Sequence, residues 1–366
     1  MADPDDLSIA VMTHPARRER ADRLVETLRP LGVTIVPDPQ PDGQPGTLRT
    51  SREAWRAAAD GAAYHLVLQD DAVPCRDFGT HLADLLSQNP ASPVALHALW
   101  NTRNGAAVRW GAARGARLIT AVPEFVPCVG LLMPRSAAEG YVAFAEGWPD
   151  PATPDDVVMR HYFAAERLRL LLTVPSLVEH HQSPSLVGND HGVYQAACFG
   201  TPPSAGWFLR SNLLIDDCRL LPVVRQGQLW LCSPASPDGH APWLTEPWGE
   251  GAHRLASGGD GLRKGFDAFL GGSARSSVDT WCRLVGTDVL RTAWTAARLL
   301  RRDHYPGVID LAPPAPDLVL RALRTILMGG FLRIPGPSQV QTVVLRNLEC
   351  LLPVVADGYG SVDPRP

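Results

Sequence analysis

Two adjacent acidic residues, Asp70 and Asp71, come directly after a short apolar run at residues 65–69. Two carboxylates this close together repel each other, so a cation or ample water is expected beside them. Carboxylate oxygens are ligands that hard divalent cations prefer, and a bound cation neutralises charge on phosphate groups. The stretch therefore predicts either a cation site at the end of a strand or a solvated turn that carries two acids by chance.

The elements that must position this pair alternate between strand and helix. Apolar runs predict buried strands at residues 7–13, 33–38, 65–69, 94–99, 117–122, 128–133 and 169–181. Amphipathic segments between them predict helices at residues 15–32, 51–62, 77–89, 136–147 and 153–168. This alternation implies an α/β sandwich with a largely parallel sheet. Functional groups are expected beyond the carboxyl ends of its strands.

Two of the helix starts are predicted from capping residues. Ser51 is a plausible cap for the second helix, and Thr153 is the candidate cap for the last one, with Pro154 at its first helical position. Asp155 and Asp156 then lie in the first turn, where a helix N-terminus favours ionised carboxylates. Acids at this place are either ordinary helix design or chemically useful bases.

The composition changes near residue 201. Short strands with many turns are expected at residues 218–251, and helical periods begin near residue 278. We therefore predict a first domain at residues 1–200 and a C-terminal module at residues 201–366, mixed at first and then mainly helical. The module is expected to shape an acceptor site or to serve as an accessory part. Its tryptophans could contact an acceptor or lie in a core, namely Trp207, Trp230, Trp243 and Trp248.

Composition and charge exclude several classes of protein. Apolar residues make up 45% of the 366 residues, which gives ample material for packed cores. The net charge of −4 argues against nucleic-acid binding driven by phosphate neutralisation. No secretory signal is visible at the start, and no run approaches the length of a membrane span. Seven scattered cysteines without a C-x-x-C pair favour reduced thiols, so a cytoplasmic location is expected.

Four segments, in order along the chain, resemble the bacterial lipopolysaccharide glycosyltransferase family, which also contains collagen galactosyltransferase domains and has a GT-A fold. The segment LQDDAVPCRDFGTHLADLL resembles the family's EDDA…F…L segment. Residues 9–33 resemble its opening strand and Arg-bearing helix, residues 128–144 its strand-to-helix turn, and residues 175–188 its P-x-L-x-x-H-x-x-x-x-S close. The resemblance covers roughly residues 7–190 and implies a GT-A-like, nucleotide-sugar-binding α/β/α sandwich.

The resemblance also implies a reaction and its participants. It implies a bacterial, cytoplasmic, metal-dependent glycosyltransferase that moves a hexose from a nucleotide sugar, with a UDP-sugar as first choice, to a hydroxyl of a saccharide, peptide or small molecule. Mn²⁺ or Mg²⁺ would rest on Asp71 and His180, with His181 as an alternative ligand, and would bridge the diphosphate of the donor. Residues expected to face the donor are Thr13, His14, Arg17, Gln69, Asp70 and Ser185.

Inverting transfer requires a base that deprotonates the acceptor hydroxyl. The resemblance places it at the start of the helix that Asp155 and Asp156 open, and we favour Asp156. A retaining mechanism is a further possibility. Among Arg17, Arg18 and Arg20, at least two are expected on a solvated helix face.

One departure from the family bears on function. Gln69 stands where the family usually has Glu or Asp, and an amide supplies no charge to a metal ion. This residue favours a second interpretation, a non-catalytic sugar- or partner-binding protein on a decayed GT-A scaffold. Motifs of P-loop, dinucleotide-binding, zinc-protease and nucleophile-elbow enzymes are absent from the sequence.

Overall fold

The computed structural model of the chain describes residues 6–181, 186, 195–209, 214–215, 220–225, 227–235, 243–251, 258–271, 282, 286–301, 313–331 and 348–360. These residues belong to two compact units. The first comprises Met1–Leu99 and Arg117–Asn212, and the second comprises Trp100–Ala116 and Leu213–Pro366. The segment Trp100–Ala116 thus belongs to the second unit. The domain boundary at residue 200 stays a prediction.

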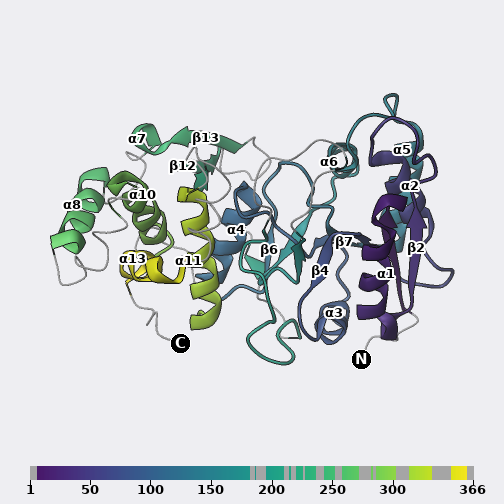
Figure 1. Cartoon of the computed structure of the whole chain (residues 1–366), viewed down its shortest axis with the longest axis horizontal. Coiled ribbons are helices and arrows are strands. Elements are labelled where there is room, and N and C mark those ends of the chain that lie inside the picture. Colours follow the sequence, from purple (N-terminus) through teal and green to yellow (C-terminus); the bar gives the residue numbers. More distant parts are fainter. Residues whose placement is uncertain are drawn as a thin grey trace. The chain divides into compact units, whose positions relative to one another are not determined.

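A mixed sheet forms the centre of the first unit (Figure 1). The seven strands of this sheet that belong to the first unit lie in the order β6-β8-β5-β7-β3-β1-β2. Among these seven strands, β1, β2, β3, β5 and β8 run in one direction, and β6 and β7 run in the other. The strands are β1 (Leu7–Thr13), β2 (Val33–Pro37), β3 (Tyr64–Gln69), β5 (Val94–Ala95), β6 (Leu118–Thr120), β7 (Gly130–Pro134) and β8 (Leu171–Thr173).

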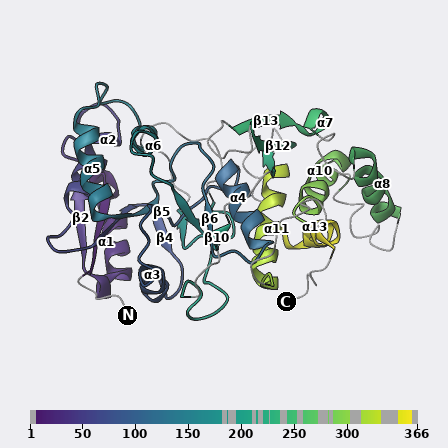
Figure 2. The ribbon, with the colours of Figure 1, turned by 180° about the vertical axis from the view of Figure 1, so that it is seen from behind.

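Helices cover both faces of this sheet. The helix α1 packs on β1 and β2, whereas α2 lies on the opposite face, as right-handed β-α-β crossovers between β1, β2 and β3 require (Figures 1 and 2). The helix α5 packs against α2. The predicted α/β fold class is therefore confirmed. The helices are α1 (Arg18–Thr27), α2 (Leu48–Arg56), α3 (Phe78–Leu86), α5 (Arg135–Glu146) and α6 (Asp155–Ala165), with 3-10 turns η2 (Pro15–Arg17) and η3 (Arg29–Leu31).

Hydrophobic residues of the first unit explain this layering. The central strand β3 is buried along almost its whole length, and Leu66 and Leu68 are fully buried. Phe78, Leu82 and Leu85 line the buried face of α3. Burial of such side chains stabilises the fold by about 1.5–3 kcal/mol each. Because these side chains supply the stability of the core, the residues at the strand ends can be polar without loss of the fold.

A small second sheet of the first unit was not predicted. The strands β4 (Ala72–Pro74) and β9 (Val178–His180) pair antiparallel, with Ala72 opposite His180. The sequence predicts one strand over residues 169–181, but the structure divides this segment into β8, which pairs in the main sheet, and β9, which leaves it. This division brings a histidine next to the aspartate pair.

Both predicted caps are wrong. Ser51 lies inside α2, which begins one turn earlier, after Thr47, because the helix extends to bury Leu48. Thr153 does not cap α6, since its hydroxyl accepts a hydrogen bond from Trp148 Nε1 at 3.0 Å. The flanking residue of α6 is Pro154, without a side-chain cap.

The second unit combines helices with a small antiparallel sheet. The strands β11, β12 and β13 pair in this order, and α10 packs against α8, α11 and α13. Among its described elements, every helix is too short or too polar to cross a bilayer, as is true of those in the first unit. Its elements are α4 (Arg103–Ala112), β10 (Leu214–Ile215), β11 (Leu221–Arg225), β12 (Gln228–Pro234), β13 (Trp243–Pro247), α7 (Trp248–Gly251), α8 (Gly258–Gly271), α10 (Thr287–Arg298), α11 (Pro316–Phe331), η6 (Leu348–Leu351) and α13 (Leu352–Tyr359).

Candidate functional site

The carboxyl ends of β1 and β3 meet at the first aspartate. Met12 of β1 lies opposite Gln69 of β3 in parallel register, so the residues that follow, Thr13 and Asp70, come together. The Thr13 hydroxyl donates a hydrogen bond to Asp70 Oδ2 at 2.8 Å, and the His14 backbone N–H donates to the same oxygen at 3.3 Å. The pairing of two parallel strands therefore fixes Asp70 against the loop that follows β1.

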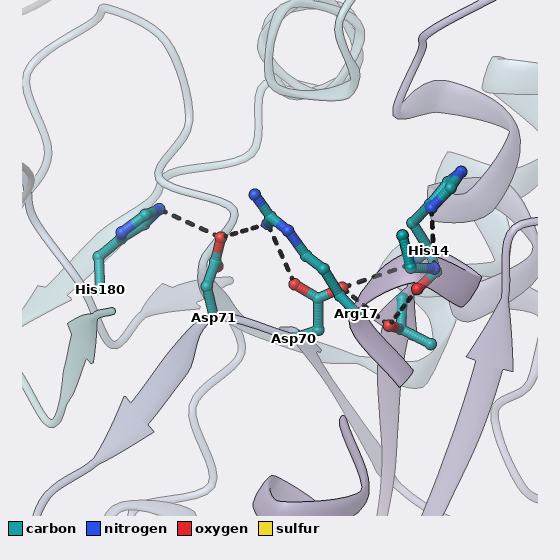
Figure 3. Close-up of polar contacts among 7 residues, drawn as sticks. His14, Arg17, Asp70, Asp71 and His180 are labelled. Atoms are coloured by element: carbon teal, nitrogen blue, oxygen red, sulfur yellow. Dashed lines mark hydrogen bonds and ion pairs between the residues drawn. The ribbon is translucent and has the colours of Figure 1, made fainter. Parts of the chain in front are cut away.

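A guanidinium group lies between the two carboxylates (Figure 3). The turn η2 leads into α1 and places Arg17 at the flanking position of that helix. Arg17 Nη1 lies 3.3 Å from Asp70 Oδ1 and 3.0 Å from Asp71 Oδ2. The side chains of Arg17, Asp70 and Asp71 are only 14%, 7% and 8% exposed. Arg17 thus supplies the positive charge that two adjacent, buried acids need.

The ladder between β4 and β9 brings the histidines to Asp71. The His181 backbone N–H donates to the carbonyl oxygen of Asp71 at 2.7 Å, which continues the register of that ladder. His180 Nε2 lies 3.4 Å from Asp71 Oδ2. Asp71 therefore lies between His180 on one side and Arg17 on the other (Figure 3). The side chain of His181 is exposed, and it is His180 that contacts the carboxylate.

The electrostatics of Asp70 follow from its surroundings. Burial raises the pKa of its carboxyl above the ordinary value, and the charge of Asp71 acts in the same direction. The hydrogen bond from Thr13 and the charge of Arg17 lower this pKa and offset part of the increase. The contacts with Thr13 and Arg17 therefore favour the ionised form of Asp70 against burial and the charge of Asp71.

The donor atoms at Asp71 suit a divalent cation. Asp71 Oδ1 is buried and has no hydrogen-bond partner among the residues that the structure describes. Carboxylate oxygen and imidazole nitrogen together suit Mn²⁺. Among the described residues, no group of three or more His, Cys, Asp or Glu side chains is arranged to hold a metal ion. The ligand atoms therefore suit an ion, but in the present arrangement Arg17 contacts one oxygen of each carboxylate, Asp70 Oδ1 and Asp71 Oδ2.

Two further residues that were expected to face the sugar donor, Gln69 and His14, lie at or near this cluster. Gln69 ends β3 with its side chain half-buried, and its backbone N–H donates to the Val129 carbonyl at 3.1 Å. The His14 ring accepts a hydrogen bond from the Ala16 backbone N–H through Nδ1 at 3.1 Å, so this ring closes the loop after β1. Ser185 lies outside the described residues. The roles of these residues stay predictions.

The second pair of acids, Asp155 and Asp156, forms a separate group at the start of α6. Asp155 is 4% exposed, and burial raises the pKa of its carboxyl, while hydrogen bonds from Thr47 and Ser51 lower it. Burial, followed by the charge of Asp155, raises the pKa of Asp156 to about 6. Asp156 Oδ1 has no hydrogen-bond partner within the described chain. Asp156 is therefore better suited than Asp155 to accept a proton at neutral pH.

The sequence analysis missed two residues next to His180, the half-buried Glu179 and the buried His97. Glu179 accepts hydrogen bonds from the backbone N–H groups of His180 and Ala196, and burial raises its pKa to about 7. Burial also lowers the pKa of His97 to about 4, and its ring centroid lies 6.5 Å from that of His180. An acid directly before two histidines was a signal, but nothing in the sequence showed that β9 would leave the main sheet.

Comparisons with known proteins add little to this geometry. No protein-family model matches the chain, and no curated protein sequence matches it. Among solved structures, a mutant of the Drosophila β-1,4-galactosyltransferase 7 in complex with manganese, UDP-Gal and xylobiose is similar over 66% of this chain and 92% of its own. The identity is 9% and the TM-score 0.30, so this likeness carries no argument about the present chain.

Proposed function

We propose that the protein is a glycosyltransferase that moves a hexose from a UDP-sugar to a hydroxyl of a saccharide, peptide or small-molecule acceptor, with inversion. One observation carries the proposal, the convergence of a threonine, an arginine, two aspartates and a histidine at the carboxyl ends of β1 and β3. Ligands of open α/β sheets bind at this edge. A guanidinium beside a carboxylate with an unused oxygen suits a diphosphate and its counter-ion.

The nucleotide would lie against the loop after β1. The planar guanidinium of Arg17 matches the oxygens of a diphosphate, and the backbone N–H groups at the start of α1 favour negative charge. Thr13, His14 and Gln69 would contact the base or ribose, and Asp70 would accept hydrogen bonds from hydroxyl groups of the sugar. These roles need Arg17 to exchange carboxylate oxygens for phosphate oxygens.

A divalent cation, Mn²⁺ or Mg²⁺, would be held by Asp71 and His180. When bound, such an ion neutralises the charge that develops on the leaving diphosphate. Asp71 Oδ1 is buried and has no hydrogen-bond partner among the described residues, which supports this assignment. Glu179 would fix the backbone of β9 from which His180 projects.

The base would be Asp156. Its pKa of about 6 leaves the carboxylate ionised at neutral pH and still basic enough to accept a proton from a hydroxyl group as that group attacks. Asp155 is more deeply buried and accepts hydrogen bonds from Thr47 and Ser51. Its surroundings suit a residue that orients the start of α6, so Asp155 is the weaker candidate.

A thermal-shift panel of nucleotide sugars, each with Mn²⁺, tests the proposal. A donor that binds the native fold raises the melting temperature by mass action. The donor found in this way should then be hydrolysed slowly to UDP, and Asp71→Ala should abolish hydrolysis while the surface variant Asp22→Ala retains it. A panel in which no nucleotide sugar shifts the melting temperature at millimolar concentration contradicts the proposal.

The contact of Arg17 with both carboxylates favours a second candidate function. A protein that keeps this ion pair and has Gln69 in place of an acid could bind a sugar or a partner without catalysis. The two functions differ in one measurement. A binding protein shifts its melting temperature with a ligand but releases no UDP, whether Mn²⁺ is present or not.

A further inference from the structure

The position of Arg17 has a consequence for any cation at this site. One nitrogen of its guanidinium contacts an oxygen of each aspartate, at 3.3 and 3.0 Å. The Asp71 oxygen that it contacts is also the oxygen that lies 3.4 Å from His180 Nε2. A cation held by Asp71 and His180 would therefore compete with Arg17 for Asp71 Oδ2.

The two aspartates need a positive charge beside them. Both side chains are more than nine-tenths buried, and Arg17 contacts an oxygen of each. Removal of Arg17 alone would leave two adjacent carboxylates buried without a counter-charge, which is strongly unfavourable. Either a proton or another cation must then take its place.

The loop that carries Arg17 is suited to an exchange of partners. Arg17 lies at the junction of η2 and α1, where backbone N–H groups and the helix dipole favour an anion. A diphosphate bound at this junction would present its oxygens to the guanidinium. These oxygens carry more negative charge than the two carboxylate oxygens that Arg17 contacts now. Arg17 would then release Asp71 at the moment the nucleotide arrives.

We propose that Arg17 and a divalent cation are alternative occupants of the Asp70–Asp71 pair, and that a nucleoside diphosphate exchanges one for the other. The inference rests on the proposed function for the identity of the nucleotide. Without nucleotide, Arg17 neutralises the pair and keeps the affinity for a cation low. With nucleotide, Arg17 contacts phosphate oxygens and the cation binds Asp71, so that the two ligands bind cooperatively, each raising the affinity for the other.

Manganese binding to the full-length protein tests the exchange. Free Mn²⁺ is measured by electron paramagnetic resonance in titrations of wild type, Arg17→Gln and Arg18→Gln, first with MnCl₂ alone. Arg17→Gln should bind Mn²⁺ at least about tenfold more tightly than wild type, a difference of about 1.4 kcal/mol. Arg18→Gln is the matched control, since the Arg18 side chain is 58% exposed and pairs with Asp22, and it should bind as wild type does.

Two additions complete the experiment. Adding Asp71→Asn to Arg17→Gln should remove the gained affinity. UDP should raise the affinity of wild type for Mn²⁺ at least about tenfold after subtraction of the Mn–UDP complex formed in buffer, and it should raise that of Arg17→Gln less. Unchanged Mn²⁺ affinity in folded Arg17→Gln, or no effect of UDP on wild type, overturns the exchange. The wild-type measurement decides even if Arg17→Gln does not fold.

The outcomes separate this inference from the proposed function. Release of UDP from a donor, together with unchanged Mn²⁺ affinity in Arg17→Gln, leaves the glycosyltransferase standing and overturns the exchange. Tighter Mn²⁺ binding in Arg17→Gln without any response to nucleotides supports competition at the carboxylates but overturns the role of the nucleotide.

Discussion

Asp70–Asp71, after β3, and Asp155–Asp156, at the start of α6, are both pairs of adjacent aspartates, but they are stabilised differently. At the first pair, a guanidinium lies within 3.3 Å of both carboxylates. At the second pair, hydroxyl groups of Thr47 and Ser51 reach Asp155, and the charge of Arg160 has the smallest effect on Asp156. Arg17 offsets part of the repulsion within the first pair, whereas the charge of Arg160 offsets little of the repulsion within the second.

This difference determines what each pair can do. A pair neutralised by a cation can exchange that cation for another, so Asp70–Asp71 suits the binding of metal ions and phosphates. At the second pair, burial followed by the charge of Asp155 raises the pKa of Asp156 to about 6. The second pair therefore suits proton transfer at neutral pH. The same dipeptide thus predicts two chemistries, and the surrounding groups decide between them.

The largest effect is expected at the first pair. Asp71→Asn keeps the shape of the side chain but removes the charge that would hold the cation. We expect UDP release and transfer to fall about a thousandfold, on the order that one electrostatic group contributes at a transition state. Initial rates with saturating donor and Mn²⁺ measure the effect, with Asp22→Asn as the surface control. A rate within tenfold of wild type would show that Asp71 holds no essential ion.

A smaller effect is expected at the second pair. Asp156→Asn should lower transfer to an acceptor about a hundredfold and leave the affinity for UDP unchanged, because the base acts on the acceptor. In wild type, transfer should fall as the pH decreases below about 6, when Asp156 becomes protonated. Asp155→Asn should retain this pH dependence. A profile that is flat from pH 5 to 8 would exclude Asp156 as the base.

The sequence allowed much of the fold to be predicted, because the first unit follows local rules. Strands β1 and β3 have continuous apolar runs, and Phe78, Leu82 and Leu85 fall on one helical stripe. The helix α4 was not predicted. Nearly all of its residues are buried, so it has no amphipathic period, and Arg109 breaks the apolar pattern. Trp207 was considered for acceptor contact, but it is buried and donates to the Val174 carbonyl.

The candidate site was predictable in its parts but not in its contacts. The aspartates, His180 and Arg17 were visible as residue types at strand and helix ends. The contact of Arg17 with the aspartates depends on how a turn folds back, which the sequence does not show, whereas Arg18 is exposed, as expected for at least two of the three arginines at this helix start. The pairing of β4 with β9 joins three-residue strands about 100 residues apart, which no local pattern encodes.

The raised pKa of Asp156 also predicts an effect on stability. Its folded pKa of about 6 exceeds the ordinary pKa of an aspartate, 3.8, so the folded state binds more protons between these two values. Wild type therefore loses stability as the pH rises from about 4 to 6. Asp156→Asn should therefore be more stable than wild type at pH 7 by about 1–2 kcal/mol, within the limit of roughly 1.4 kcal/mol per pKa unit.

Urea unfolding at pH 4 and pH 7 measures this difference, which should be nearly absent at the lower pH. Asp60→Asn serves as the control, because the Asp60 side chain is fully exposed. Equal stability of Asp156→Asn and wild type at pH 7 would mean that α6 relieves the repulsion within the second pair by another contact.

The smallest effect is expected from the hydroxyl groups that support each pair. Thr13→Val removes the hydrogen bond to Asp70 Oδ2, which is 2.8 Å long, and should destabilise the fold by about 1–2 kcal/mol at pH 7. This bond favours the ionised carboxyl, so the loss should shrink as the pH falls and Asp70 becomes protonated. Ser51→Ala removes the weakest of the hydrogen bonds that favour the ionised form of Asp155. Thr13→Val should also weaken UDP binding severalfold in a calorimetric titration, whereas Ser51→Ala should leave it unchanged. Equal weakening by both variants would mean that the two pairs serve one common ligand.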